Sequence, residues 1–157
     1  MKAFLIATVM ALAMLDTHAF ADTGLVTKQS KYTVRETVER FEAEVKAKAA
    51  DGWIVFSEID HAAATKEVGL EMRPRTLIIF GNPKGGTPAM IKRATLAIDL
   101  PMKALVWQDD QDGVWLTYNS SAYGAMHVFP RHGLSTPDEA AKALDRFLTD
   151  VTDRSTQ

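Results

Sequence analysis

Apolar and polar residues along this chain follow two different periods, which predict a long helix on either side of a β-rich centre. After Thr33, and again after Thr136, apolar residues recur at spacings of three and four, which places them on one stripe of a helix. Thr33 with Glu36, and Thr136 with Glu139, match the capping-box pattern that begins a helix. The two predicted stripes consist of Val34, Val38, Phe41, Val45 and Ala49, and of Ala140, Leu144, Phe147, Leu148 and Val151.

Five runs rich in β-branched and aromatic residues predict strands. The most apolar run, Leu77–Phe80, is typical of a strand covered on both faces. The last two runs are joined by a polar link that ends in Asp112-Gly113, which indicates a hairpin with Trp107 close to Trp115. The predicted strands cover residues 25–32, 53–59, 76–81, 103–108 and 114–119. A short helix is expected over residues 62–68, and a loop after residue 121 through Gly124.

The least ordinary stretch follows the buried strand and reads Gly-Asn-Pro-Lys-Gly-Gly-Thr over residues 81–87. Because Gly and Pro interrupt regular structure, it predicts a loop, followed by a short helix over residues 88–95 that has Thr87 as its cap. Backbone N–H groups in such a loop, together with a lysine, can hold an anion or another small ligand. The candidate ligand-binding residues are Asn82, Lys84, Gly85, Gly86 and Thr87.

This stretch does not match a nucleotide-binding P-loop. That motif has a Lys between its last Gly and the Ser or Thr, whereas Thr87 follows Gly86 directly. The alternative to a ligand site is a structural turn held by Asn82 and the glycines.

Two histidines stand at the predicted ends of elements: His61 after the second strand and His132 before the last helix. Either can pair with a carboxylate as the general base of a hydrolase or isomerase, or can bind a metal ion. Both can equally be structural histidines with satisfied hydrogen bonds. The carboxylates considered are Glu58, Asp60 and Asp99, and a metal or haem carrier would use His61, His127, His132 and Met90.

Composition narrows the choice of function. The chain of 157 residues has a net charge of −2, which argues against nucleic-acid binding, because such proteins carry a basic patch or stripe. It contains no Cys, which excludes disulfides, thiolate metal sites and thiol catalysis. Many large apolar side chains are left either to fill the core or to line a cavity between sheet and helices: Trp53, Phe56, Phe80, Trp107, Trp115, Tyr118, Met72, Met90 and Met102.

Residues 1–21 predict a cleaved signal peptide. Lys2 precedes an apolar run over residues 3–15, and small residues stand at positions 19 and 21, the two that a signal peptidase reads. The run is shorter than the roughly 20 apolar residues that cross a bilayer, so we expect no transmembrane segment after cleavage. The sequence therefore predicts a periplasmic or secreted protein in which residues 22–157 form a single domain.

Several short motifs occur in an order that resembles the DUF302 family, over about residues 25–150. This resemblance implies an α+β, TBP-like fold with the order β-α-β(4)-α, in which two long helices pack on one face of an antiparallel sheet, often in a homodimer. The family has no assigned function. Compared with the family pattern, residues 127–130 stand as an insertion before Arg131-His132. Either His127 or His132 can therefore correspond to the histidine of the family pattern. The motifs are Ile59-Asp60-His61, Phe80-Gly81-Asn82-Pro83-Lys84, Gly86-Thr87, Asp99-Leu100-Pro101, Tyr118-Asn119 and Arg131-His132.

The leading hypothesis is an exported binding or interaction domain without enzymatic activity, which forms a homodimer and binds a small ligand or partner near residues 81–87, His61 and His132. One alternative is an enzyme that uses His61 or His132 with Asp60 or Asp99. The other is a metal-binding or haem-binding protein. The sequence names no cofactor.

Overall fold

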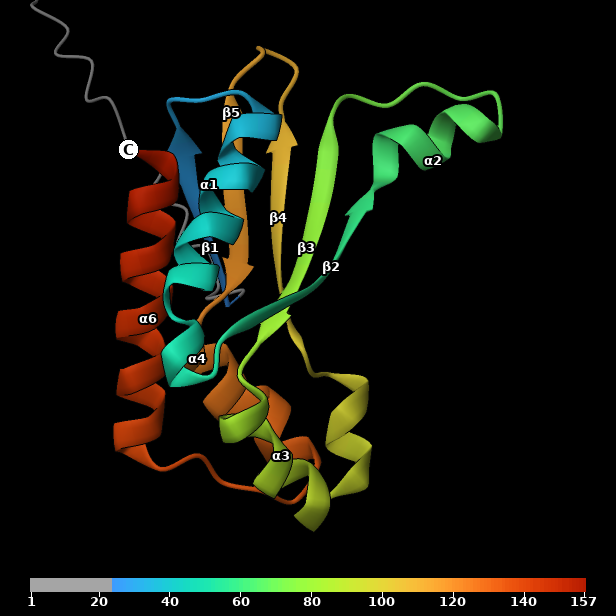
Figure 1. Ribbon diagram of the computed structural model, residues 1–157. Coiled ribbons are helices and arrows are strands. Elements are labelled where there is room, and N and C mark those ends of the chain that lie inside the picture. Colours follow the sequence, from blue (N-terminus) through green and yellow to red (C-terminus); the bar gives the residue numbers. More distant parts are fainter. Residues whose placement is uncertain (1–23) are drawn as a thin grey trace, which may run out of the picture.

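The structure is a computed structural model that describes residues 24–157, and the expected signal peptide lies outside these residues. The described chain contains five strands: β1 (Leu25–Ser30), β2 (Ile54–Asp60), β3 (Arg75–Gly81), β4 (Met102–Gln108) and β5 (Val114–Asn119). They form one antiparallel sheet in the order β1-β5-β4-β3-β2 (Figure 1). β1 and β2 are therefore the edge strands.

Two long helices, α1 (Val34–Ala47) and α6 (Asp138–Thr156), pack side by side on one face of this sheet (Figure 1). The predicted α+β arrangement is confirmed. Between helices and sheet, the ring of Phe41 meets the ring of Phe80 edge-on at 5.0 Å, and the rings of Trp53 and Phe147 stack at 3.4 Å. Phe41 and Phe80 are fully buried, and a fully buried large apolar side chain contributes roughly 1.5–3 kcal/mol, so this layer stabilises the fold.

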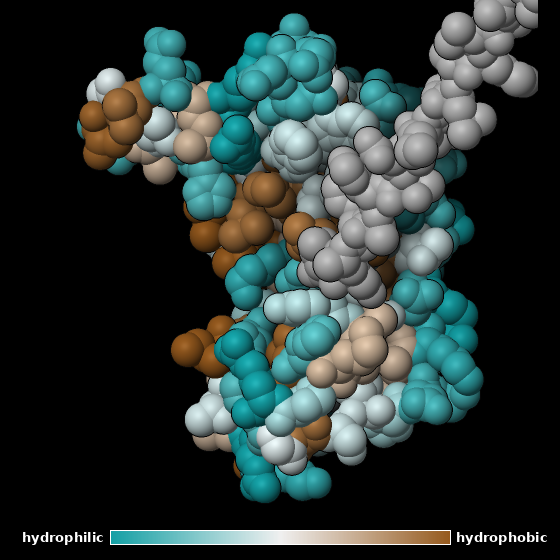
Figure 2. Space-filling model, turned by 180° about the vertical axis from the view of Figure 1, so that it is seen from behind, coloured by the Kyte–Doolittle hydropathy of each residue, from teal (hydrophilic) through white to brown (hydrophobic). Residues whose placement is uncertain are grey.

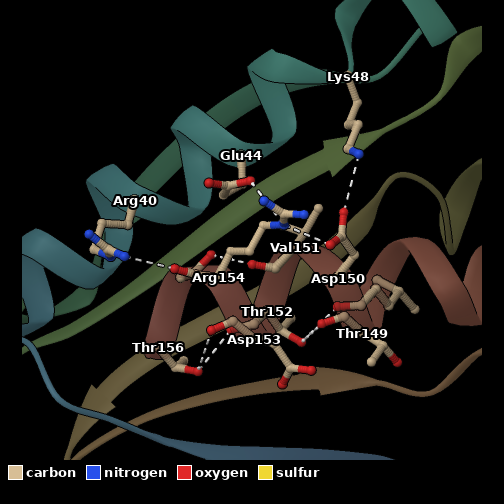
Figure 3. Close-up of polar contacts among 12 residues, drawn as sticks. Arg40, Glu44, Lys48, Thr149, Asp150, Val151, Thr152, Asp153, Arg154 and Thr156 are labelled. Atoms are coloured by element: carbon tan, nitrogen blue, oxygen red, sulfur yellow. Dashed lines mark hydrogen bonds and ion pairs between the residues drawn. The ribbon is translucent and has the colours of Figure 1, made fainter.

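Polar contacts along the outer side of the two helices fix how they lie against each other (Figure 3). The Arg40 guanidinium donates to the carbonyl of Arg154 at 2.9 Å. Asp150 of α6 pairs with Lys48, which follows the last residue of α1, at 3.1 Å, and with Arg154 of its own helix at 2.7 Å. Exposed ion pairs contribute only about 0–1 kcal/mol each, so these contacts orient the helices more than they stabilise them.

The two predicted capping boxes have different outcomes. The Thr33 hydroxyl accepts from the N–H of Glu36 at 3.2 Å, and the Glu36 carboxylate accepts from the N–H of Thr33 at 3.0 Å, so the first box is confirmed. The second is wrong: α6 begins at Asp138, with Pro137 as an N-cap residue that makes no side-chain bond. Thr136 therefore stands one residue too early to cap α6.

The predicted hairpin between β4 and β5 is confirmed. Trp107 lies opposite Trp115, with ring centroids 6.3 Å apart. One oxygen of the Asp109 carboxylate accepts from the N–H groups of Gln111 and Gly113 at 2.9 and 2.8 Å. Its other oxygen accepts from the Trp115 indole at 2.6 Å, and this bond holds the pKa of Asp109 below its ordinary value. The acidic turn is thus stabilised from within.

The connections β3–β4 and β5–α6, residues 82–101 and 120–137, gather at one end of the sheet (Figure 1); we call them the end layer. The loop predicted over residues 81–87 is wrong, because a helix already begins at Pro83, and the loop expected up to Gly124 becomes helical from Ser121. The end layer contains α3 (Pro83–Lys92), η2 (Ala94–Ile98), α4 (Ser121–Tyr123), η3 (Gly124–Val128) and α5 (Phe129–Arg131).

The short helix predicted over residues 62–68 is confirmed as α2 (His61–Glu67). With the end of β2, α2 extends away from the body of the molecule, at the end of the sheet opposite to the end layer (Figure 1). Large apolar side chains on this arm are exposed: Ile59, Val68, Leu70 and Met72.

Candidate functional site

A cavity of about 310 Å³ lies where the end layer meets the sheet and the first turns of α6. Ligand pockets usually measure ~300–1,000 Å³, so this one suits a small molecule. Four of the side chains considered for a cavity from the sequence line it: Phe56, Phe80, Met102 and Tyr118. The other large apolar side chains in its wall are Pro83, Leu100, Pro101, Tyr123, Val128, Phe129, Leu144 and Leu148.

The cavity wall depends on the unexpected start of α3. The Asn82 side-chain oxygen accepts from the N–H of Gly85 at 3.1 Å, so Asn82, and not Thr87, caps this helix. Pro83 then occupies the first helical position, where its missing N–H and fixed φ are tolerated. Gly86 faces Leu100: a Cβ added to Gly86 would lie 3.6 Å from Leu100 Cδ1.

The predicted ligand-binding residues at the start of α3 fasten this helix to its neighbours. The N–H of Gly86 bonds to the carbonyl of Asn82 at 2.9 Å. The Asn82 amide donates to the carbonyl of Asp51 at 3.1 Å, and Lys84 Nζ donates to the carbonyl of Ala50 at 3.3 Å, both in η1 (Ala49–Asp51). These bonds engage the N–H of Gly86, the side-chain amide of Asn82 and one of the three N–H donors of Lys84. Asn82, Gly85 and Gly86 also line the cavity.

One polar group in the cavity wall is not satisfied. Thr136 lines the cavity, and its buried hydroxyl has no hydrogen-bond partner within the described residues. An unpaired buried hydroxyl costs about 1–3 kcal/mol. A ligand oxygen placed beside Thr136 would remove this cost.

His132 and Asp99, two of the predicted catalytic residues, are in contact. His132 Nε2 lies 2.6 Å from Asp99 Oδ2, and His132 Nδ1 lies 2.9 Å from the Thr95 hydroxyl. Arg131 pairs with the second oxygen of Asp99 at 2.6 Å. Residues 33 positions apart are thereby joined, which ties η2 to the segment after α5.

The hydrogen bond from His132, helped by the charge of Arg131, holds the pKa of Asp99 below its ordinary value. The His132 side chain is only 7% exposed, and both of its ring nitrogens have partners. Asp99 lines the cavity, whereas His132 is not among the lining residues. His132 and Arg131 therefore keep the Asp99 carboxylate ionised in the cavity wall. Neither ring nitrogen of His132 is free to act as a base on a molecule in the cavity.

His61 and Asp60 lie at the other end of the sheet. Asp60 pairs with Thr76 and Ile54 pairs with Gly81, so the start of α2 is separated from the end layer by most of the length of β3, about 17 Å at ~3.3 Å per residue. Asp60 caps α2 by accepting from the N–H of Ala63 at 3.0 Å. Within one chain, therefore, the expected grouping of His61 with residues 81–87 and His132 is wrong.

The remaining candidates have other partners. Glu58 pairs with Arg35 of α1 at 2.8 Å. The His127 ring lies 5.1 Å from the Tyr123 ring. Between residues 24 and 157, no group of three or more His, Cys, Asp or Glu side chains could hold a metal ion.

Sequence reasoning did not find Thr95 or Thr136 as site residues. The role of Thr95 depends on a contact with His132 across 37 positions, for which no local pattern exists. Thr136 matches the capping-box pattern, and no local signal in the sequence distinguishes it from a helix cap.

The fold and the cavity define a small α+β domain with an antiparallel sheet, two long helices on one face and an end layer that covers a mostly apolar cavity. Among known proteins, the family model described as "Domain of unknown function DUF302" matches residues 26–151. The chain belongs to this family.

A solved structure of an uncharacterized conserved DUF302 protein from Bacillus stearothermophilus has the same fold, with a TM-score of 0.67 and 20% sequence identity. The superposition covers 85% of this chain and 98% of that one.

Curated relatives extend the comparison to longer proteins. A fluoride-specific ion channel FluC 1 of Brucella suis is 45% identical over 124 residues, which cover 78% of this chain and 46% of that protein. FluC 2 of Brucella melitensis has the same identity over 43% of its length. This chain thus spans less than half of these relatives, and none of its helices within residues 24–157 is long and apolar enough to cross a membrane.

Proposed function

We propose that the protein binds a small, mostly apolar molecule in the cavity beneath the end layer. The observation that carries the proposal is the unpaired Thr136 hydroxyl in a cavity of about 310 Å³ with an apolar wall. Such a cavity selects a ligand with one hydrogen-bonding oxygen and an apolar body. The ionised Asp99 in the wall disfavours an anionic ligand, so a neutral alcohol, ketone or ester fits best.

Binding is favoured over catalysis by the state of the His132–Asp99 pair. A general base must reach a substrate proton directly or through one water, but both nitrogens of His132 are occupied by Thr95 and Asp99. The pair serves to position the cavity wall.

Fluorescence of N-phenyl-1-naphthylamine, displaced by 1-octanol, tests this proposal. Gly86→Leu adds a side chain beside Leu100 and should weaken binding of the dye at least tenfold by filling the cavity. Thr136→Val keeps the shape but loses one hydrogen bond, worth ~1 kcal/mol, so octanol should bind about fivefold more weakly while dye binding changes less than twofold. Ala64→Leu, on the distant α2, is the control and should change neither.

Native mass spectrometry of the protein purified without detergent gives the second readout. We expect a retained small molecule on the wild type and none on Gly86→Leu. Dye binding that survives Gly86→Leu in a folded protein would contradict the proposal.

Export and dimer formation stay part of this proposal. We propose that the leader is removed after Ala21, which N-terminal sequencing of the periplasmic protein would establish; an uncleaved cytoplasmic chain would contradict it. We propose that β2, an edge strand with the exposed side chains Phe56 and Ile59, pairs with a second copy. Ile59→Lys should then halve the mass measured by light scattering, whereas Leu25→Lys on the other edge should not.

A second candidate function is suggested by the Brucella relatives, in which the matching segment is part of a protein named as a fluoride channel. We propose that this chain works beside such a channel in fluoride resistance. Deletion of its gene should lower the fluoride concentration that stops growth, with chloride as the control salt. An unchanged fluoride tolerance would refute this role without affecting the cavity proposal.

A further inference from the structure

Positive charge is concentrated in the end layer. Residues 82–101 and 120–137 contain four Lys and Arg but a single Asp, a net charge of +3 in a chain whose total is −2. Lys103, at the start of β4, adds a fifth cation next to them, because its Nζ donates to the carbonyls of Asp99 and Pro101. The end layer is thus a basic end on an otherwise acidic molecule.

Four of these five cations have no carboxylate partner within residues 24–157; the exception is Arg131, which pairs with Asp99. Among the described residues, Lys84, Lys92, Arg93 and Lys103 form no ion pair. On the two long helices, in contrast, cations such as Lys46 and Arg154 pair with nearby acids. Cations that are exposed and unpaired remain available to an anionic partner.

The same end carries the two most exposed large apolar side chains in the described part of the chain. Ile91 in α3 is 81% exposed and Ile98 in η2 is 76% exposed. Met126 in η3 is also exposed. Figure 2 shows apolar side chains standing out among polar ones in the lower part of the molecule, which is the end layer.

We propose that the end layer docks on the surface of a bilayer that contains anionic lipids. Short helices that combine Lys and Arg with protruding aliphatic side chains lie in the interface plane of membranes, where the cations meet lipid phosphates and the aliphatic groups enter the acyl boundary. Ile91 and Ile98 supply the aliphatic groups, and Lys92 and Arg93 stand between them in the sequence. The proposal goes beyond ligand binding and does not depend on what the cavity holds.

The aliphatic side chains decide between lipid and nucleic acid as the anionic partner. Proteins that bind single-stranded nucleic acid stack bases on aromatic rings, and those that bind duplexes leave little apolar surface beside the phosphates. A nucleic acid would leave the side chains of Ile91 and Ile98 in water, whereas a bilayer would bury them, which is favourable.

Co-sedimentation with vesicles tests the docking. The full-length mature protein is mixed at 50 mM salt with vesicles of phosphatidylcholine alone or with 40% phosphatidylglycerol. We expect binding to the anionic vesicles only, weakened by 300 mM salt. Lys92→Gln with Arg93→Gln should lower affinity about 25-fold, at ~1 kcal/mol per cation, and Ile91→Ser with Ile98→Ser should lower it at least tenfold.

The matched control is Lys66→Gln with Val68→Ser, at the C-terminal end of α2. Val68 is 72% exposed but lies at the opposite end of the sheet. This variant should bind vesicles like the wild type. All four residues of the test pairs are exposed, so the melting temperature should be unchanged. A loss of vesicle binding can then be assigned to the lost side chains and not to unfolding. Equal losses in test and control variants, no binding to anionic vesicles, or binding to DNA but not to vesicles would each overturn the proposal.

Discussion

The contact between His132 and Asp99 should be worth a measurable part of the stability. Asp99→Asn keeps the shape of the side chain but removes its charge. A hydrogen bond to a charged group contributes about 1.5–3 kcal/mol, and the exposed ion pair with Arg131 adds ~0–1 kcal/mol. We expect a loss of about 2 kcal/mol, which for a domain of this size lowers the melting temperature by roughly 7 °C.

Thermal denaturation followed by circular dichroism measures this loss. The pKa of Asp99 is lowered in the folded protein by the bond from His132, so its contribution is fully present above the unfolded value of ~3.9 and is lost as the pH falls through the lower folded pKa. The difference between wild type and Asp99→Asn should therefore be present at pH 7 and smaller at pH 3.

Asp110→Asn provides a matched control, because Asp110 pairs with Arg73 at 3.4 Å while its side chain is 93% exposed. It should lower the melting temperature by less than about 2 °C, as expected for a surface pair. A melting temperature of Asp99→Asn that stays within 1 °C of the wild type at pH 7 would refute the inference that this contact holds the cavity wall.

Three further changes test the fold. Thr33→Ala removes the capping box and should cost ~1 kcal/mol in urea denaturation; an unchanged midpoint would contradict the cap. Phe147→Ala removes the ring stacked on Trp53 and should cost about 3 kcal/mol and shift tryptophan fluorescence to the red; a spectrum like that of the wild type would argue against the stack. Gly52→Ala places a Cβ 2.8 Å from Lys84 Cδ, at a φ of +97°, and should cost ~1–2 kcal/mol, whereas Gly69→Ala, with a free Cβ position, should cost less.

The sequence predicted the long elements because their signals are local. Thr33 and Glu36 stand within one turn, and the apolar stripe that follows has a single solution as a helix. The Asp112-Gly113 link likewise fixes which strands pair and brings Trp107 to Trp115. For these elements, propensity, periodicity and packing agree.

The end layer could not be predicted, because its local signals conflict. Gly85, Gly86 and Pro88 all argue against a helix, yet α3 contains them, because Asn82 caps it and Leu100 packs against it. The capping-box pattern occurs at both Thr33 and Thr136. Only the tertiary structure shows that the Thr136 hydroxyl lies in the cavity wall and caps no helix.

Only part of the candidate site could be predicted, because its residues come together through contacts between distant parts of the chain. His61 and His132 were equal candidates in the sequence, because each stands next to an element end with an acid within reach. β2 runs antiparallel to β3, so His61, which follows β2, lies at the end of the sheet opposite to the end layer. The sequence alone does not show how the strands pair. Asp99 was one of three carboxylates considered as a partner of His132. Thr95 was not considered, since nothing in its sequence surroundings distinguishes it.

The uneven distribution of ionised groups gives the molecule a permanent electric dipole. With +3 in residues 82–101 and 120–137 and a total of −2, the remainder of the chain carries the compensating negative charge. A dipole of this kind turns a diffusing protein in the field of a charged surface before contact. The molecule would therefore reach a negatively charged surface with α3 and η2 foremost, at a rate that falls as the ionic strength rises.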